Sequence, residues 1–218
     1  GFKRSSANFI DDTEVEVQRR VVGGFEAGLG HKEFVGATTL EGNLAYKRGT
    51  GAFNSLAAPE EAFGEGTSRF RLVSADANFI LPFKGSEHRL RYSANWRAQW
   101  NRTPLTPQDR LAIGGRYSVR GFDGESSLSA ERGWTLRNEL SAPLGQSAQE
   151  VYLGLDYGRV SGPSSDQLVG NSLTGAVVGL RGSAKFLQYD LFVGGPINKP
   201  DGFRTSGNTA GFNLNLSF

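Results

Sequence analysis

The sequence predicts an all-β fold, in the form of a transmembrane antiparallel β-barrel. Apolar and polar residues alternate with a period of two in segments of about ten residues, the length of a tilted strand that crosses a bilayer. The connections between these segments are alternately short and long. Aromatic residues make up 11% of the 218 residues, which include 30 glycines. No apolar run reaches the roughly 18 residues that a transmembrane helix needs.

The clearest strand covers residues 90–101. One of its faces carries Leu90, Tyr92, Ala94, Trp96, Ala98 and Trp100. The other face carries Arg91, Ser93, Asn95, Arg97, Gln99 and Asn101. A helical period would mix these two sets, so the segment is a strand with one apolar and one polar face.

Eight further strands show the same alternation. They cover residues 15–29, 33–48, 69–83, 132–144, 150–160, 173–183, 186–195 and 209–218. Asp156 lies on the polar face of its strand, opposite Leu153, Leu155 and Tyr157. Residues 1–10 could hold the outer end of a tenth strand, but residues 3–6 are charged or polar, and we expect them to form a strand tail and a loop.

The connections favour a bacterial barrel over a soluble sandwich. The short ones are expected at 30–32, 84–87, 145–149 and 184–185. The long ones are expected at 49–68, 102–131, 161–172 and 196–208. All long loops then emerge at one end, as in outer-membrane barrels, where the apolar faces meet lipid and the polar faces line the lumen.

Nine strands cannot close a bacterial barrel, which has an even number of strands. The chain also begins at Gly1, contains no methionine and lacks the signal segment that an exported protein needs. We therefore expect residues 1–218 to be the carboxy-terminal part of a longer barrel. The last strand ends on Phe218, and such a terminal aromatic resembles the assembly signal of outer-membrane proteins.

The composition excludes several kinds of function. The net charge is only +2, and no dense basic cluster indicates a nucleic-acid partner. Cysteine is absent, so thiol chemistry and disulfides are impossible. We expect no cofactor.

An enzyme is the weaker alternative. His31 and His88 are expected at short turns, and neither belongs to a recognisable serine–histidine arrangement. The adjacent carboxylates Glu60 and Glu61 have no histidine or cysteine nearby in the sequence to complete a metal site. Trp96, Trp100 and Trp134 are expected in an aromatic girdle or against lipid.

The longest loop carries an unusual motif. Residues 114–125 read Gly-Gly-Arg-Tyr-Ser-Val-Arg-Gly-Phe-Asp-Gly-Glu, with glycines around two arginines and two aromatic residues. A loop of about thirty residues is usually functional or disordered. A passive porin remains the stronger alternative, because Arg91, Arg97, Arg137 and Glu139 would also give a polar lumen, but a porin does not need this motif.

Val119-Arg120-Gly121-Phe122 resembles the loop-six motif of the outer-membrane assembly and secretion superfamily. Residues 113–140 resemble its TpsB branch, the two-partner secretion transporters, and the likeness extends over the whole chain. The resemblance implies that the loop folds into the lumen and that Arg120 pairs with a wall aspartate. Asp156, in Gly154-Leu155-Asp156-Tyr157-Gly158, fits that role, and the alternation independently places it on the lumen face.

The resemblance also implies a full-length transporter of sixteen strands with two POTRA domains and an amino-terminal plug helix, of which this chain would hold about strands eight to sixteen. Its implied function is passage of a large unfolded TpsA-type exoprotein (an adhesin, haemolysin or contact-dependent toxin) across the bacterial outer membrane without nucleotide hydrolysis. The implied partners are that exoprotein, outer-membrane lipid with lipopolysaccharide, and the barrel-assembly machinery. Which exoprotein is carried stays open.

Overall fold

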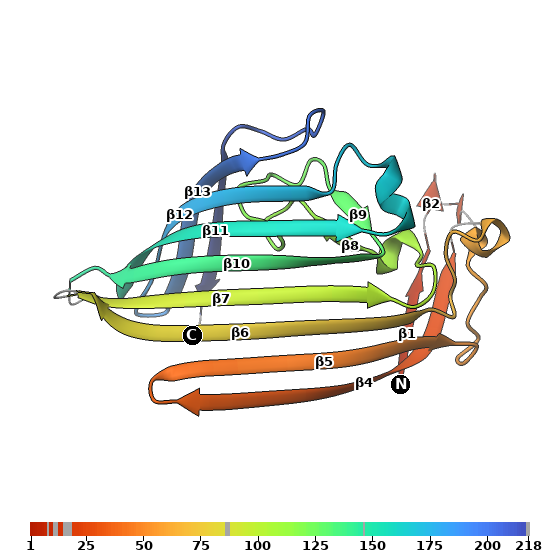
Figure 1. The fold of residues 1–218 in the computed structure, drawn as a ribbon, viewed down its shortest axis with the longest axis horizontal. Helices are drawn as coiled ribbons and strands as arrows, with labels where there is room; N and C mark the ends of the chain where they lie inside the picture. Colours follow the sequence, from red (N-terminus) through yellow and green to blue (C-terminus); the bar gives the residue numbers. More distant parts are fainter. Residues whose placement is uncertain (8, 11–12, 15–18, 86–87, 146, 217–218) are drawn as a thin grey trace.

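The computed structural model describes residues 1–7, 9–10, 13–14, 19–85, 88–145 and 147–216. Its main feature is a 10-stranded antiparallel sheet that curls into an open partial barrel (Figure 1). In strand order the sheet contains β1 (Phe2–Ser6), β4 (Arg20–Val35), β5 (Thr38–Thr50), β6 (Arg71–Gly85), β7 (His88–Asn101), β10 (Arg132–Pro143), β11 (Gln149–Ser161), β12 (Ser172–Ala184), β13 (Leu187–Asn198) and β14 (Thr209–Leu216). The predicted all-β barrel fold is confirmed.

The prediction for residues 3–6 is wrong, because they belong to a tenth strand. In β1, Phe2 pairs with Gly24 and Ser6 pairs with Arg20. Residues FKRSS show no apolar alternation, so only the neighbouring strand reveals them. The next strand was also placed too early: β4 begins at Arg20, while Thr13–Glu14 forms the short strand β3 with β2 (Phe9–Ile10). Val15 and Val17 lie outside the described residues.

The first short turn lies later than predicted. Residues 30–32 are inside β4, where His31 pairs with Gly42, and the turn follows Val35. Gly36 has a φ of 61°, a left-handed conformation that glycine adopts without steric cost. The outward positions His31 and Glu33 are polar and the lumen position Phe34 is apolar, so the alternation ends before the turn and could not locate it.

The two faces of the sheet follow the predicted alternation. Leu29 pairs with Leu44, and Leu153 pairs with Val178, all on the outward face. Leu29 and Leu153 are 80% and 62% exposed, as expected for side chains that meet lipid. The same register places Trp96, Trp100 and Trp134 on this outward face.

The long loops gather at one end of the partial barrel and the short connections at the other (Figure 1). The long loops are residues 51–70, 102–131, 162–171 and 199–208. Three of them contain a 3-10 helix, and two of these helices are η2 (Pro59–Phe63) and η4 (Pro163–Gln167). Among the described residues, no helix is long and apolar enough to cross a membrane.

The loop of residues 102–131 has structure of its own. It contains the 3-10 helix η3 (Pro107–Asp109) and a hairpin of β8 (Leu111–Ile113) and β9 (Leu128–Ala130). The hairpin packs on the inner wall and on the loop of residues 199–208 through a cluster of buried residues: Ile113, Val119, Phe122, Leu128, Ala130, Val160, Leu173 and Phe203. This apolar contact holds the hairpin tip, residues 114–127, against the sheet.

Candidate functional site

Glycines shape the hairpin tip that carries the motif. Gly114, Gly121 and Gly124 have φ values of 122°, 96° and 85°, a region that residues with a Cβ rarely adopt. Gly121 is constrained twice, because a Cβ there would also collide with the Gly195 carbonyl oxygen of β13. The chain can therefore turn sharply directly after Arg120.

Arg120 is held by Asp156 of β11 in a three-point contact. The Arg120 backbone N–H and Nε donate to Asp156 Oδ2 at 2.9 and 2.8 Å, and Nη2 donates to Oδ1 at 2.9 Å. The two side chains are only 7% and 0% exposed. The structure thus brings together the two residues that the resemblance paired, in the bidentate geometry that guanidinium and carboxylate groups favour.

Glu139 of β10 is a second carboxylate partner of Arg120, and the sequence did not reveal it. Arg120 Nη1 donates to Glu139 Oε2 at 2.8 Å. Alternation placed Glu139 on the lumen face, but only the register, in which it pairs with Gly154, shows that it adjoins Asp156. Arg137, directly opposite Asp156, approaches the same carboxylate at 3.5 Å.

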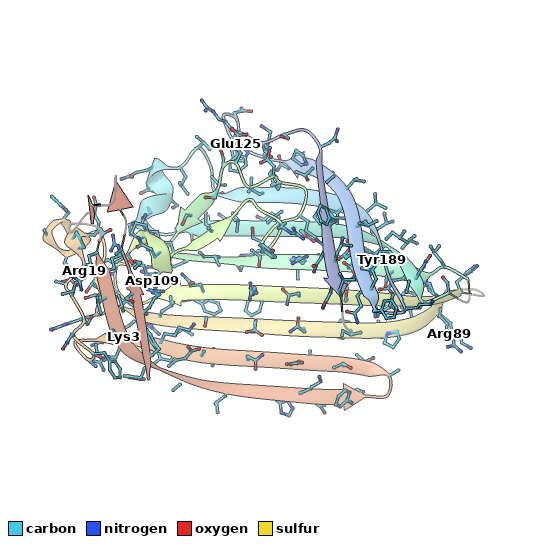
Figure 2. The ribbon with its side chains drawn as sticks, turned by 180° about the vertical axis from the view of Figure 1, so that it is seen from behind. Lys3, Arg19, Arg89, Asp109, Glu125 and Tyr189 are labelled. Atoms are coloured by element: carbon cyan, nitrogen blue, oxygen red, sulfur yellow. The ribbon has the colours of Figure 1, made fainter. Side chains whose placement is uncertain are left out.

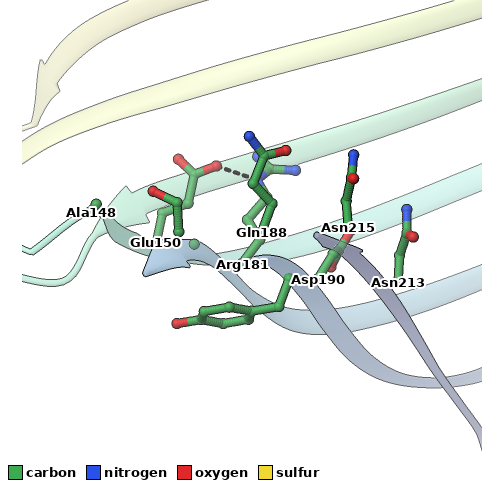
Figure 3. A pocket seen from close by; sticks show the side chains of 10 residues that line it. Ala148, Glu150, Arg181, Gln188, Asp190, Asn213 and Asn215 are labelled. Atoms are coloured by element: carbon green, nitrogen blue, oxygen red, sulfur yellow. Dashed lines mark hydrogen bonds and ion pairs between the residues drawn. The ribbon is translucent and has the colours of Figure 1, made fainter. Parts of the chain in front are cut away.

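The charged contacts continue along the inner wall toward the short-turn end. Arg181 of β12 contacts Glu139 at 2.6 Å and also forms an ion pair with Glu150. Arg91 of β7 contacts Glu150 at 2.5 Å. Figure 3 shows Glu150 and Arg181 at this end, in a pocket to which Asp190 and Asn213 also contribute. Arginines and carboxylates therefore alternate from mid-wall to the barrel mouth.

Small residues in the wall make room for the motif. A Cβ at Gly154 would lie 2.6 Å from Arg120 Nη2, and one at Gly158 would lie 2.8 Å from Val119 Cγ2. A Cβ at Gly175 would collide with the Arg120 carbonyl oxygen. These three glycines, which we call the glycine floor, let the loop backbone approach the sheet closely. The sequence signal that could have revealed this floor is the presence of glycines at lumen-facing positions of adjacent strands.

The rest of the motif anchors the tip. Val119 is fully buried, and the Phe122 ring packs edge-on against Phe203 with centroids 5.8 Å apart. Asp123 Oδ2 accepts the Ser206 backbone N–H at 2.7 Å, and Oδ1 accepts the Glu125 backbone N–H at 3.0 Å. These two hydrogen bonds hold the pKa of the Asp123 carboxyl below its ordinary value, and the one from Ser206 has the larger effect. The tip is thus tied to residues 199–208.

The histidine and the carboxylates that we considered for an enzyme or a metal site make contacts within the fold. His31 lies inside β4, not at a turn as predicted, and its Nε2 is 3.8 Å from Glu33. Glu60 accepts a hydrogen bond from Arg20, which lowers the pKa of its carboxyl. Glu61 accepts the Ser68 backbone N–H at 2.9 Å. The part of the chain that the structure describes contains no cluster that could hold a metal ion, and Phe218 lies outside that part.

Residues 2–182 match the family described as haemolysin secretion/activation protein ShlB/FhaC/HecB. FhaC, a family member to which we likened the sequence, is one of the three proteins named. The outer membrane transporter CdiB-2 of Burkholderia pseudomallei is 39% identical over 99% of this chain and 38% of its own length. The outer membrane transporter CdiB of Dickeya dadantii is 25% identical over 99% of this chain and 39% of its own length.

Solved structures agree with the sequence relatives. CdiB from Acinetobacter baumannii superimposes with a TM-score of 0.86 at 34% identity, over 98% of this chain and 37% of that chain. CdiB from Escherichia coli gives a TM-score of 0.84 at 25% identity, over 97% of this chain and 40% of that chain. The chain therefore spans less than half the length of these relatives. Because the family match covers most of the chain, the protein belongs to the haemolysin secretion/activation family of ShlB, FhaC and HecB and forms part of an outer-membrane β-barrel.

Proposed function

We propose that this chain is the carboxy-terminal barrel part of a two-partner secretion transporter, which passes a large unfolded TpsA-type exoprotein through its lumen to the cell surface. The observation that carries the proposal is the engagement of Arg120, which lies in a long loop and yet reaches a fully buried aspartate on the inner wall. Family membership and the CdiB relatives support it.

The Arg120–Asp156 contact is suited to hold the loop in a defined place. A guanidinium presents a rigid fork of donors, so one pair fixes both the position and the direction of the hairpin tip. Breaking a secluded pair by removing one partner costs about 3 to 5 kcal/mol, and water in the lumen lowers that cost. The loop is therefore held firmly enough to obstruct or shape the conduit. The free energy of binding the exoprotein could still release it.

The proposal extends to the parts that this chain does not include. The full-length protein would have sixteen strands, of which this chain would supply about the last nine or ten, together with two POTRA domains and a plug helix. Those domains would recognise the exoprotein, so its class, whether adhesin, haemolysin or toxin, is decided there. Assembly would use the terminal Phe218 and the barrel-assembly machinery.

The test is secretion of the cognate exoprotein by the full-length transporter carrying Arg120→Ala, Asp156→Ala or both. Arg97→Ala is the matched control, because Arg97 shares the lumen face but forms no ion pair in the described part of the chain. Heat-modifiable migration checks that each barrel folds.

We expect each single change to abolish secretion from a folded barrel, with no further loss in the double variant, while the control secretes normally. Normal secretion by Arg120→Ala would refute the role of the loop. Ion conductance without any exoprotein secretion by the unaltered transporter would favour the passive porin.

A further inference from the structure

Five arginines line the outward rim of the barrel at the long-loop end. We call this set the arginine belt: Arg48, Arg71, Arg102, Arg132 and Arg159. They lie on five successive strands or at their ends, from β5 to β11, and all five are exposed. Arg48 pairs directly with Arg71, and the Arg102 backbone N–H donates to the Arg71 carbonyl oxygen at 2.8 Å. The belt is therefore continuous across the sheet.

Aromatic residues place the belt at a defined depth. In four of the five strands an aromatic residue stands two positions further into the membrane on the same face: Tyr46, Trp100, Trp134 and Tyr157. Trp134 and Tyr157 pack together with ring centroids 5.0 Å apart. Tryptophan and tyrosine mark the boundary between acyl chains and headgroups. Two residues of strand add about 7 Å, so the arginines lie among the headgroups.

Among the described residues, the belt arginines have no acidic partner. None of the five forms an ion pair in the part of the chain that the structure describes. Arg132 Nε donates to Asn101 Oδ1 at 2.6 Å, and this amide oxygen is a neutral acceptor. Like charges directly opposite each other, as at Arg48 and Arg71, destabilise a sheet. An external anion would remove that repulsion.

The other end of the same outward face lacks this feature. The described outward positions of the strands near the short turns include Glu33, His88, Gln149 and Leu187, with no lysine or arginine among them. Arg89 is at that end, as Figure 2 shows, but the register turns it to the lumen face. A basic rim on one side only indicates a ligand confined to one leaflet.

We propose that the arginine belt binds the phosphate groups of lipopolysaccharide in the outer leaflet. Guanidinium groups pair with phosphate bidentately, and the spacing along adjacent strands lets one multiply phosphorylated headgroup meet two arginines. The proposal rests on the outer-membrane barrel and not on the transport proposed above. It assigns residues to the lipopolysaccharide contact that the resemblance implied only in general.

The experiment measures lipopolysaccharide binding to the full-length transporter in phosphatidylcholine nanodiscs. The variants are Arg48→Gln with Arg71→Gln, and all five belt arginines changed to glutamine. The control combines Arg89→Gln, on the lumen face, with Arg204→Gln, in the long loop of residues 199–208, and both arginines lie outside the belt. Dephosphorylated lipopolysaccharide is the second probe, because it keeps the acyl chains and lacks the anion.

We expect about a fivefold loss of affinity for each belt arginine removed, hence roughly 25-fold for the double variant. The control should bind as the unaltered protein does, and the dephosphorylated probe should bind every variant equally weakly. Equal binding of lipopolysaccharide by the double variant and the control would overturn the proposal. So would equally tight binding of both probes by the unaltered protein. If the variant with all five arginines replaced does not assemble, the double variant decides the question.

Discussion

Two stretches of the inner wall carry charges at the same alternate strand positions, yet their surroundings differ. On β4 and β5, Lys47 and Glu26 approach to 3.4 Å with side chains 37% and 47% exposed. On β11, Asp156 meets Arg120 at 2.8 Å, and the two side chains are 0% and 7% exposed. Strand alternation places both carboxylates on the lumen face. Only the hairpin of residues 102–131 removes one of them from water.

This difference explains why equivalent charges should have unequal effects. An exposed ion pair contributes little, because water and salt screen it. A secluded pair, once broken, leaves an uncompensated charge in a poorly solvated site. The inner wall of β10 to β12 is therefore a docking surface, whereas the stretch of β4 to β6 around Glu26, Lys47 and Asp76 is a solvated lining.

Asp156→Asn should have the largest effect, because it leaves the Arg120 charge with Glu139 as its closest remaining partner. We expect docking of the hairpin to weaken by about 3 to 5 kcal/mol, or less if water enters. Since the protein has no cysteine, Ala130→Cys supplies a single thiol at a buried position of the hairpin. That thiol should label rapidly in Asp156→Asn and slowly otherwise. Asp76→Asn, on the solvated lining, is the control, and a protected thiol in Asp156→Asn would contradict the prediction.

Gly175→Ala tests the glycine floor. Its Cβ would collide with the Arg120 carbonyl oxygen, so we expect the hairpin to shift and docking to lose about 1 to 3 kcal/mol, as in overpacked cores. Gly42→Ala is the matched control, because its Cβ would meet only the Asp76 carbonyl oxygen at 3.9 Å. The same thiol labelling should distinguish the two. Equal labelling rates would show that the floor does not need glycine.

Asp123 should make the outer end of the docked loop sensitive to acid. Its pKa is lowered in the folded protein by the Ser206 and Glu125 N–H groups, so its contribution is complete above the unfolded pKa of about 3.9. The contribution is lost as the pH falls through the lower folded pKa. A dye on Gly207→Cys, where a Cβ meets no atom within 4 Å, should gain mobility in that acid range. In Asp123→Asn the dye should be equally mobile at all pH values, and a persisting transition would implicate another group.

Lys32→Gln should have the smallest effect. Lys32 and Glu41 are 3.4 Å apart with side chains 50% and 39% exposed, so the expected loss of stability is below about 1 kcal/mol. Urea unfolding of the reconstituted transporter measures it, with Glu41→Gln as the reciprocal variant. A loss comparable to that in Asp156→Asn would mean that the lining of β4 to β6 is not solvated as described.

Much of the fold could be predicted because a strand shows its two faces in its own residues. Leu153 and Leu155 lie on the face opposite Asp156 whichever strands pair with β11. Alternation alone therefore placed the aspartate on the lumen face. Boundaries were less predictable. The apolar alternation of β4 ends several residues before the turn at Gly36, and β1 shows none, since its pairing depends on the backbone of β4.

The candidate site divides in the same way. The sequence by itself determined that the strands are two-faced, that the long loops share one end, and that Arg120 stands in a glycine-rich loop tip. Those properties reside in local order along the chain. The tertiary structure alone decided that Glu139 joins Asp156 around Arg120, and that Gly154, Gly158 and Gly175 form one floor. Those relations depend on strand register and loop docking, which join residues far apart in sequence.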